Sequence, residues 1–283
     1  MKTENIMHKT GKSGSTLPEE EVEIRKMQGH WLLAKMGKRV LRPGGLELTR
    51  NMLAALDIGK SDEVVEFAPG LGVTAEMTLR KNPARYTAIE REEAAAKQVR
   101  RYLQGENQTC RIGLAEKTGL PDESATVVYG EAMLTMQPDR KKSEIIREAA
   151  RILKTGGRYG IHEVGIIPSD IDDALKKEIK KELSRSIHIS ALPVTMDEWK
   201  ALLESEGLEV SIVLTEPFHL LEPKRLVQDE GLPGALKFGG NLLRNREARS
   251  VVLGMKRVFR KYKAHLSGIS MVAQKPGNAE DNP

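Results

Sequence analysis

The chain has 283 residues, of which 30% are charged and 4% are aromatic, and its formal net charge is +5. This composition is typical of a soluble, helix-rich protein with one large domain, or with one domain and appended segments. The single cysteine, Cys110, excludes a disulfide framework and a multi-cysteine metal site, and favours a reducing, cytoplasmic compartment. We expect neither a signal peptide nor a transmembrane segment, because the start is polar and no apolar run approaches ~18 residues.

The N-terminal part is predicted to contain a tail and two helices. Residues 1–20 are rich in Lys, Ser, Gly and Glu, so we expect a disordered tail there. The spacing of apolar residues predicts a helix over 21–38 and a second helix over 46–56. The sequence Arg-Pro-Gly-Gly at 42–45 separates them, because proline and glycine interrupt helices. Residues 21–56 are therefore the N-terminal helices of the predicted domain.

The chain is organised around a strand, a glycine turn and a helix. Residues 62–67 are predicted to form a buried strand, because the central positions are largely β-branched or aromatic. Pro69, Gly70 and Gly72 form the turn, and a helical pattern follows at once. Glycines let a ligand approach the backbone, and the start of a helix offers unpaired N–H groups. The pattern predicts the first half of a βαβ unit that binds a ligand, although a purely structural turn is an alternative.

A second strand, residues 85–89, ends in Glu90, which lies eighteen residues after Gly72. An acid at this position can accept hydrogen bonds from both hydroxyls of a ribose, so a nucleotide cofactor is indicated. The full dinucleotide fingerprint, G-x-G-x-x-G, is absent. A nicotinamide-dependent dehydrogenase is therefore the weaker of the two enzyme hypotheses.

The rest of the chain alternates between predicted strands and helices. Helices are predicted at 92–103, 139–153, 170–186 and from Thr195 onward, and strands at 110–113, 125–129, 158–161, 208–214 and 267–273. Lys-Thr-Gly-Gly at 154–157 is predicted to be the glycine C-cap of the helix before it. Such alternation predicts an α/β fold with a mostly parallel sheet.

Three motifs resemble those of the class I S-adenosyl-L-methionine (SAM) methyltransferases, in particular the ubiquinone/menaquinone C-methyltransferase-like group. Residues 66–72, Glu-x-Ala-x-Gly-x-Gly, resemble motif I, and Ala68 replaces its first glycine. Gly-Leu-Ala-Glu followed by Leu-Pro within 113–121 resembles the loop beside the adenine, and Leu114 replaces the usual aspartate. Arg-x-Leu-Lys-x-Gly-Gly-Arg at 151–158 resembles the motif before the fifth strand.

The resemblance implies an α/β fold with a doubly wound, seven-stranded, mostly parallel sheet of the Rossmann-like kind. A single SAM-binding methyltransferase domain is expected over 21–276, followed by a short tail at 277–283. SAM is the implied cofactor, and Glu116 is expected to take the place of the usual aspartate. The implied cofactor-binding residues are Glu66, Ala68, Pro69, Gly70, Gly72, Glu90, Arg91, Ala115, Glu116 and Glu131.

Candidate catalytic residues follow the fourth and fifth strands, where the resemblance places the transferred methyl group. His162 is the candidate general base, with Glu131 or Glu163 orienting it. The alternative is a strand-end histidine that is bonded to backbone. A base is needed only if the acceptor must lose a proton. Ligands at metal-binding spacing are lacking, so no metal site is predicted.

About fifty residues separate the last two strands, where the family has a simple hairpin. An amphipathic helix is predicted in the second half of this insertion from the spacing of Val251, Val252, Met255, Val258, Phe259 and Tyr262. Residues 222–264 contain eleven Lys or Arg and four acids, a net +7 that leaves −2 for the rest. We expect the insertion, 219–265, to fold over the strand ends as a lid, with 164–194 and 21–40 as further lid candidates.

Three functions are compatible with these features. The leading hypothesis is SAM-dependent methyl transfer to a small, apolar or anionic acceptor enclosed by helical lids. The alternative is an RNA-binding or RNA-modifying protein that uses 222–264, but few aromatics are available there for base stacking. A third possibility is peripheral contact between this segment and an anionic membrane. A monomer and a homodimer are both compatible with the sequence.

Overall fold

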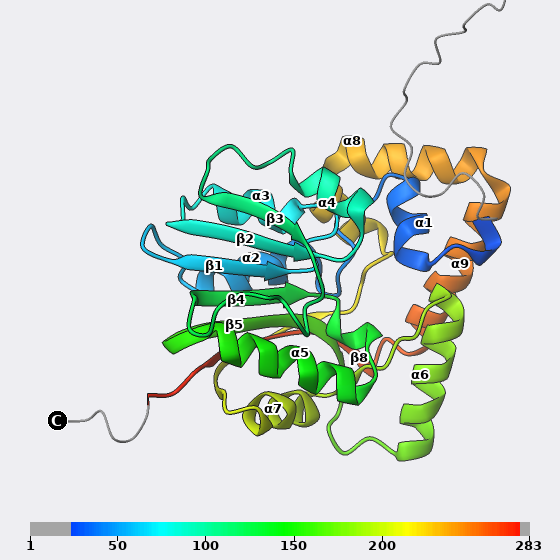
Figure 1. The fold of residues 1–283 in the computed structure, drawn as a ribbon. Coiled ribbons are helices and arrows are strands. Elements are labelled where there is room, and N and C mark those ends of the chain that lie inside the picture. The colour runs from blue at the N-terminus through cyan, green and yellow to red at the C-terminus, as the bar shows by residue number, and fades with distance from the viewer. Residues whose placement is uncertain (1–23, 278–283) are drawn as a thin grey trace, which may run out of the picture.

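The computed structural model describes residues 24–277, and its central feature is an open sheet with helices on both faces (Figure 1). The long strands are β1 Glu63–Phe67, β2 Arg85–Glu90, β3 Gln108–Ile112, β4 Ala125–Glu131, β5 Leu153–Ile166, β7 Glu209–Pro217 and β8 Leu266–Gln274. Their order is β3-β2-β1-β4-β5-β8-β7. The first five of these are parallel, whereas β8 runs antiparallel to β5 and β7. The predicted fold, a mostly parallel α/β sheet, is confirmed.

Two features of β5 differ from the prediction. A short strand, β6 Val194–Thr195, pairs with its C-terminal end and adds an eighth strand to the sheet. The glycine C-cap predicted at 154–157 is wrong, because the preceding helix ends at Ile152 and β5 begins at once. The Gly156 N–H donates to the carbonyl of Lys275 at 2.8 Å, and the Lys275 N–H donates to the carbonyl of Gly157 at 2.9 Å. Bonds to a segment so distant in the chain override a local capping pattern.

The helices on the two faces of the sheet build two separate apolar cores. These helices are α2 Gly45–Ala55, α3 Val73–Leu79, α4 Glu93–Val99, α5 Asp139–Ile152 and α7 Met196–Ser205. Ile145 of α5 and Trp199 of α7 belong to one core, whereas Leu53 of α2 and Ala75 of α3 belong to the other. Thr195 begins α7 with a capping box, in which its hydroxyl accepts from the Glu198 N–H and the Glu198 carboxylate accepts from the Thr195 N–H.

A third core lies at one end of the sheet, on the right in Figure 1, and joins helices from three parts of the chain. They are α1 Gly29–Lys35, α6 Asp173–Ile187 and α9 Arg246–Lys261. A Cβ on Gly29 would lie 3.0 Å from the Cβ of Ile187 and 3.0 Å from the Cε of Met255, so glycine permits this close packing. The predicted helix over 21–38 is shorter than expected, and only a 3₁₀ turn, Ile24–Lys26, precedes α1. The tail predicted at 1–20 lies outside the described residues, as does 278–283.

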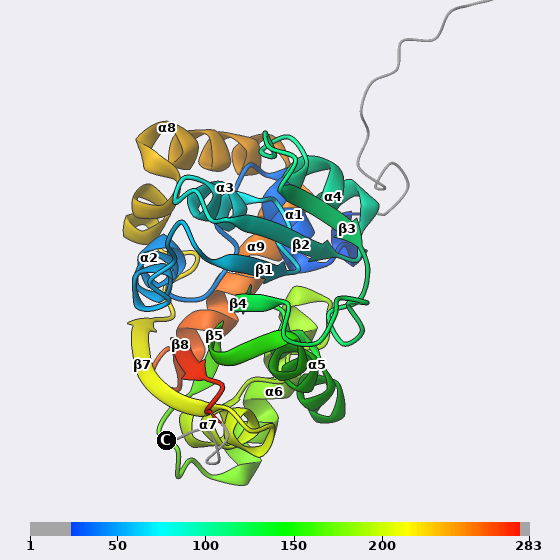
Figure 2. The ribbon, with the colours of Figure 1, turned by 60° about the vertical axis from the view of Figure 1, so that its left-hand side comes forward.

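The insertion between β7 and β8 consists of two helices rather than one. The predicted helix is α9, and it is preceded by α8 Pro223–Arg244. Gly231 bends α8, since its φ of 71° and ψ of 167° are not helical. In Figures 1 and 2 α8 extends along one edge of the molecule, where it packs against α2, and α9 packs against α6.

Candidate active site

A cavity of 760 Å³ opens where β1, β2, β3 and β4 end. The loops after these strands form one side, and residues from 26–31 and 39–42 form the other. The predicted cofactor residues that line it are Glu66, Ala68, Pro69, Gly70, Glu90, Arg91, Ala115, Glu116 and Glu131. Gly72 does not line the cavity and packs against Tyr102. The fold therefore brings together at one cavity residues that the sequence spreads over 66–131.

The turn after β1 has the backbone that its glycines allow. Ala68, Gly70 and Gly72 have φ values of 50°, 56° and 76°. A Cβ built on Gly70 would have only the Ala68 carbonyl oxygen nearby, at 4.0 Å, so this backbone faces open space. A Cβ on Gly72 would lie 2.8 Å from Tyr102, so this glycine serves packing instead. The turn can thus receive a ligand over Gly70, and alanine at 68 accepts a left-handed conformation at a cost of about 1 kcal/mol.

Glu90 closes the cavity beside this turn. Its Oε2 accepts a hydrogen bond from the Gly70 N–H at 3.0 Å, and its Oε1 accepts from the Glu92 N–H at 3.0 Å. The side chain is buried except where it lines the cavity. An ionised carboxylate retains lone pairs beyond these two bonds, so Glu90 can also accept from ribose hydroxyls. Together with the open space over the Gly70 backbone, this carboxylate acceptor fits an adenosine-containing cofactor.

Glu66 lies beneath the turn in a fully buried position. Its carboxylate accepts hydrogen bonds from the hydroxyls of Tyr86 and Tyr129, the latter at 2.8 Å. Burial raises the pKa of Glu66 to about 7, although the two tyrosine hydroxyls act in the opposite direction. Because Glu66 gains or loses its proton near neutral pH, its titration ties the stability of this region to pH.

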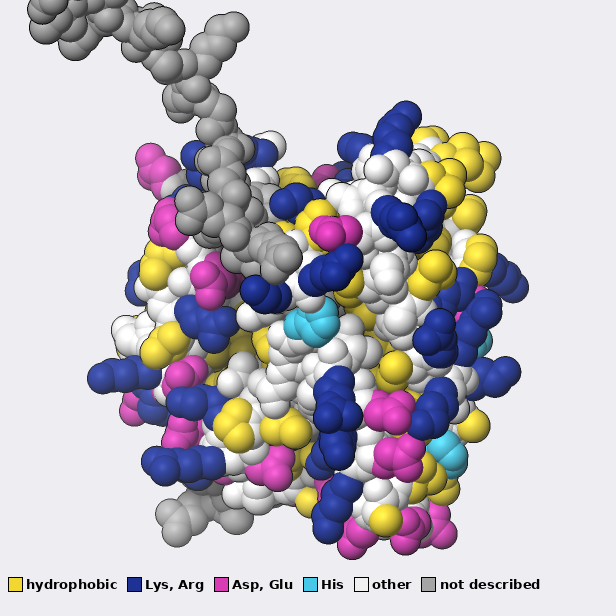
Figure 3. Space-filling view, turned by 90° about the vertical axis from the view of Figure 1, so that its right-hand side faces the viewer, with side chains coloured by type: hydrophobic (Ala, Val, Ile, Leu, Met, Phe, Trp, Pro, Cys, Tyr) yellow, Lys and Arg dark blue, Asp and Glu magenta, His cyan; other side chains and the backbone are white. Residues whose placement is uncertain are grey.

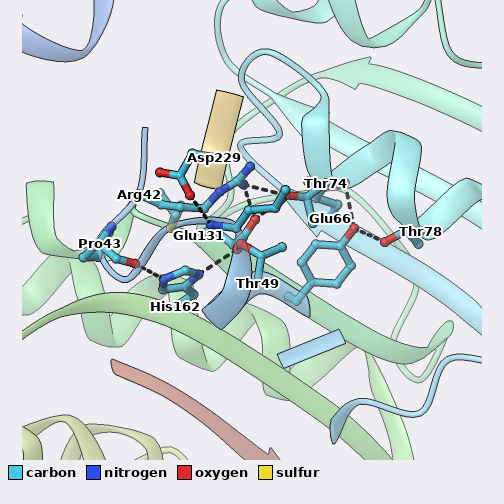
Figure 4. A network of polar contacts seen from close by, with 12 residues as sticks. Arg42, Pro43, Thr49, Glu66, Thr74, Thr78, Glu131, His162 and Asp229 are labelled. Carbon is cyan, nitrogen blue, oxygen red and sulfur yellow. Dashed lines mark hydrogen bonds and ion pairs between the residues drawn. The ribbon is translucent and has the colours of Figure 1, made fainter. Parts of the chain in front are cut away.

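Glu131 is the centre of a buried polar network at the end of β4 (Figure 4). It accepts hydrogen bonds from Arg42 and Thr74, from the Thr49 hydroxyl at 2.6 Å, and from Nδ1 of His162 at 2.7 Å. Burial opposes ionisation of Glu131, but the Arg42 guanidinium and then the His162 hydrogen bond outweigh it and lower the pKa to about 2. Four partners occupy this carboxylate, so it is already engaged as an acceptor.

His162 and Glu163 are fully buried and do not line the cavity. The Nε2 of His162 contacts the carbonyl oxygen of Pro43, and its Nδ1 contacts Glu131, so both ring nitrogens are engaged by acceptors. Glu163 accepts from the backbone N–H groups of Met133, Leu134 and Thr135 at 3.0, 2.8 and 2.9 Å. Burial raises the pKa of the Glu163 carboxyl. These contacts fix the loop after β4, which carries Met133 into the cavity wall.

Arg42 was not identified from the sequence, where it stands only as the residue before a Pro-Gly-Gly break. It lines the cavity, pairs with Glu131 and contacts the Thr74 hydroxyl at the start of α3. Within the described residues its Nε is buried without a hydrogen-bond partner. The arginine therefore presents one unused donor in a largely buried site, where a polar group without a partner is costly.

Helix α8 of the insertion binds the backbone on both sides of Arg42. Glu230 Oε1 of α8 accepts from the N–H groups of Arg39 and Val40, both at 2.8 Å. Asp229 Oδ1 accepts from the Leu46 N–H at 2.9 Å, and Asp229 Oδ2 lies 3.3 Å from the buried ammonium of Lys38. Burial lowers the pKa of Lys38, against the attraction of the two carboxylates. Residues of α8 and α9 do not line the cavity, so within the described chain the insertion supports the site rather than covering it.

Part of the cavity wall is formed by residues of the predicted lid segment 21–40 and of the segment after β4. Met27, His30 and Trp31 come from the first of these segments, and Met133 and Met136 come from the second. The His30 and Trp31 rings lie 5.0 Å apart. Burial, and then the charge of Arg91, lower the pKa of His30 to about 4, so its imidazole is neutral at pH 7. This wall is mostly apolar, with one neutral histidine.

The adenine-side loop lies where the resemblance implied. Leu114 and Ala115 line the cavity, and Glu116 Oε1 pairs with Lys141 Nζ at 3.0 Å. Within residues 24–277, no group of three or more His, Cys, Asp or Glu side chains is placed so that it could hold a metal ion. A helix long and apolar enough to cross a membrane is also lacking in this described part.

A mostly parallel open sheet with a glycine turn after β1 and a carboxylate at the end of β2 is typical of a nucleotide-binding α/β fold. Residues 65–161 match the family model described as a methyltransferase domain. An uncharacterized protein of Haemophilus influenzae is 30% identical over 225 residues, which cover 77% of this chain and 88% of the relative. The chain belongs to the class I SAM-dependent methyltransferases, and SAM is the cofactor of that class.

Two further proteins illustrate the similarity. The 27-O-demethylrifamycin SV methyltransferase of Amycolatopsis mediterranei is 27% identical over 166 residues, 57% of this chain and 59% of that one. A phosphoethanolamine N-methyltransferase 2 of Haemonchus contortus, solved with S-adenosylhomocysteine, superimposes with a TM-score of 0.66 at 13% identity. That match covers 88% of this chain and 58% of the other, and it supports the fold alone.

Proposed function

We propose that this protein transfers the methyl group of SAM to a small acceptor with an apolar surface, held in the outer part of the 760 Å³ cavity. The observation that carries the proposal is that Met27, Trp31, Met133 and Met136 line the same cavity as the glycine turn. Apolar walls suit an acceptor with apolar groups, whereas the nearby Arg42 and Lys141 suit an anionic substituent.

The residues of this chain would act mainly by binding and positioning. SAM supplies an activated methyl group, and its displacement requires alignment and exclusion of water more than covalent assistance. Gly70 and Glu90 would hold the adenosine, and Ala115 would lie beside the base. Arg42, anchored by Glu131, would fix the approach of polar groups through its free Nε. The ubiquinone/menaquinone C-methyltransferase-like subgroup stays a prediction.

The proposed roles of the predicted catalytic residues follow from their contacts. We assign Glu131, His162 and Glu163 to positioning, since their acceptor atoms and ring nitrogens are engaged by the protein. His30 is the candidate to accept a hydrogen bond from a hydroxyl group of the methyl acceptor, because its neutral ring borders the cavity. An RNA-modifying role has less support, since the basic insertion does not border the cavity.

Calorimetric titration with SAM tests the cofactor site. We expect binding by the wild type and roughly 10- to 100-fold weaker binding by Glu90→Ala, which loses charged hydrogen bonds to the ribose. Glu106→Ala, the same change at an exposed acid away from the cavity, should bind like the wild type. Failure of the wild type to bind SAM at hundreds of micromolar, or equal affinity for Glu90→Ala, would contradict the assignment.

Methyl transfer to a panel of small aromatic and aliphatic alcohols, amines and acids, with methyl-labelled SAM, tests the acceptor proposal. We expect label in apolar or anionic compounds, and reduced transfer by Trp31→Ala without loss of SAM affinity. Transfer to RNA with none to small molecules would overturn the proposal.

A further inference from the structure

The second half of α8 presents an apolar surface that residues 24–277 leave uncovered. Leu232, Leu236 and Leu243 are 60%, 67% and 72% exposed. Spacings of four and seven residues place the three on one face of a helix. Gly239 and Gly240 lie between them along the helix, and a Cβ on either would have no neighbour within 4 Å. Single exposed leucines are ordinary, but an aligned set of three on one helix indicates a contact surface.

This helix is held firmly by its other face. Phe238 is buried in the core that α1, α6 and α9 share. The side-chain amide of Asn241 donates to the Met36 carbonyl at 2.9 Å. The leucines are therefore not a core face that has failed to pack, because the same helix already packs its opposite side. We call Leu232, Leu236 and Leu243 the leucine face.

Positive charge lies at the C-terminal end of the leucine face. Arg244, Arg246 and Arg249 follow it at the junction of α8 and α9, and in the described part of the chain they lack an acidic partner within ion-pair distance. Glu247 is the only acid between 231 and 257, and it pairs with Arg25 at 3.4 Å. Figure 3, which views the side of the molecule with α1, α6 and α9, shows hydrophobic side chains and Lys or Arg side chains gathered together along its right-hand edge.

We propose that the leucine face and its flanking arginines bind the anionic surface of a lipid bilayer. Leucines on one face of a helix can enter the boundary between head groups and acyl chains, while arginines beside them meet lipid phosphates. A bilayer covers the apolar side chains and neutralises the basic ones in one contact. The proposal is independent of the identity of the methyl acceptor.

Charge argues against the other occupants. A second copy of this chain would bring its own Arg244, Arg246 and Arg249 toward the same residues, and like charges oppose such a contact. Nucleic acid would neutralise the arginines but leave the leucines in water, because its phosphates offer no apolar partner. The bilayer is the surface that satisfies both halves of the patch.

Co-sedimentation of the full chain with vesicles tests the proposal. We expect at least roughly tenfold more binding to phosphatidylcholine vesicles that contain about one third phosphatidylglycerol than to phosphatidylcholine alone, with a decline as salt increases. The variant L232S/L236S/L243S should lose most of this binding, and R244Q/R246Q/R249Q should lose the preference for anionic lipid. I212S/V213S, which changes exposed apolar residues on β7, is the matched control and should bind like the wild type.

Three results would overturn the proposal: no binding to anionic vesicles, undiminished binding by the leucine variant, or a wild-type dimer that the leucine substitutions convert to a monomer. The last would assign the surface to a second copy. Thermal melts followed by circular dichroism test whether each variant is folded. Because the replaced side chains are exposed, the melting temperature should be nearly unchanged, and lost binding then comes from the changed surface rather than from unfolding.

Discussion

The two walls of the cavity are built in different ways. The wall at the strand ends consists of short motifs: Gly70 lies in the turn after β1, and Glu90 is the last residue of β2. The opposite wall depends on residues far apart in the chain, since Glu230 lies about 190 positions from the N–H groups of Arg39 and Val40 that it binds. Cofactor chemistry thus rests on local backbone, whereas the acceptor side rests on tertiary contacts. Substitutions on the second wall should therefore act first through stability.

The largest effect is expected at Arg42. Arg42→Ala leaves the buried Glu131 carboxylate without its cation, which should cost about 3–5 kcal/mol of unfolding free energy and abolish methyl transfer. Urea unfolding measures the first effect. The double variant R42A/E131Q should recover part of the loss, because the uncompensated charge is gone. Arg39→Ala, an exposed neighbour, is the control and should change stability by less than about 1 kcal/mol.

Breaking the α8 anchor should have the next largest effect. Glu230→Ala removes the acceptor of two backbone N–H groups and a carboxylate beside buried Lys38, a loss of about 2–4 kcal/mol. Hydrogen exchange should rise in 38–46, and SAM affinity should fall much less than methyl transfer. Glu247→Ala, at an exposed ion pair, should leave exchange there unchanged. Equal effects of the two variants would remove the distinction between the walls.

The two buried acids should give opposite pH dependences. The pKa of Glu66 is raised to about 7, so the folded state holds a proton that the unfolded state releases, and its contribution to stability is lost as pH rises from 4.5 through 7. Glu66→Gln should flatten this window, a change of about 2–3 kcal/mol in unfolding free energy between its ends. The pKa of Glu131 is lowered to about 2, so its contribution is present above pH 4.5 and is lost as pH falls through 2. The first assignment would be contradicted if the wild-type protein lost no stability between pH 5 and 8. It would also be contradicted if Glu66→Gln lost as much stability over this range as the wild type.

The smallest effect is expected in the turn. Ala68→Gly should stabilise the protein by up to about 1 kcal/mol, because glycine adopts the φ of 50° without a steric penalty. Ala96→Gly, within α4, makes the same change in a helix and should destabilise by about 1 kcal/mol. SAM affinity should change little in both. Loss of stability in Ala68→Gly would show that the alanine methyl contributes packing that outweighs backbone strain.

The insertion shows why part of the structure escaped prediction. The amphipathic pattern of α9 is regular, and a helix was predicted in this half of the insertion. Gly231 and Pro233 conceal α8, because both residues disfavour a helix in isolation. Burial of Phe238 and the bonds of Asp229 and Glu230 to 38–46 outweigh that local cost. The insertion was expected to be a lid from the strand order alone. In the structure, α8 of the insertion instead binds the backbone of residues 39–46.

By itself the sequence determined the alternation of strands and helices, the glycine turn over Gly70 and the acid at 90, because these depend on residue types within a few positions of one another. The tertiary structure decided that Arg42 meets Glu131, that His162 is enclosed between Glu131 and the Pro43 carbonyl, and that His30 borders the cavity. The physical reason is that burial and ion pairing depend on which distant segments meet. No local pattern of a lone arginine or histidine carries that information.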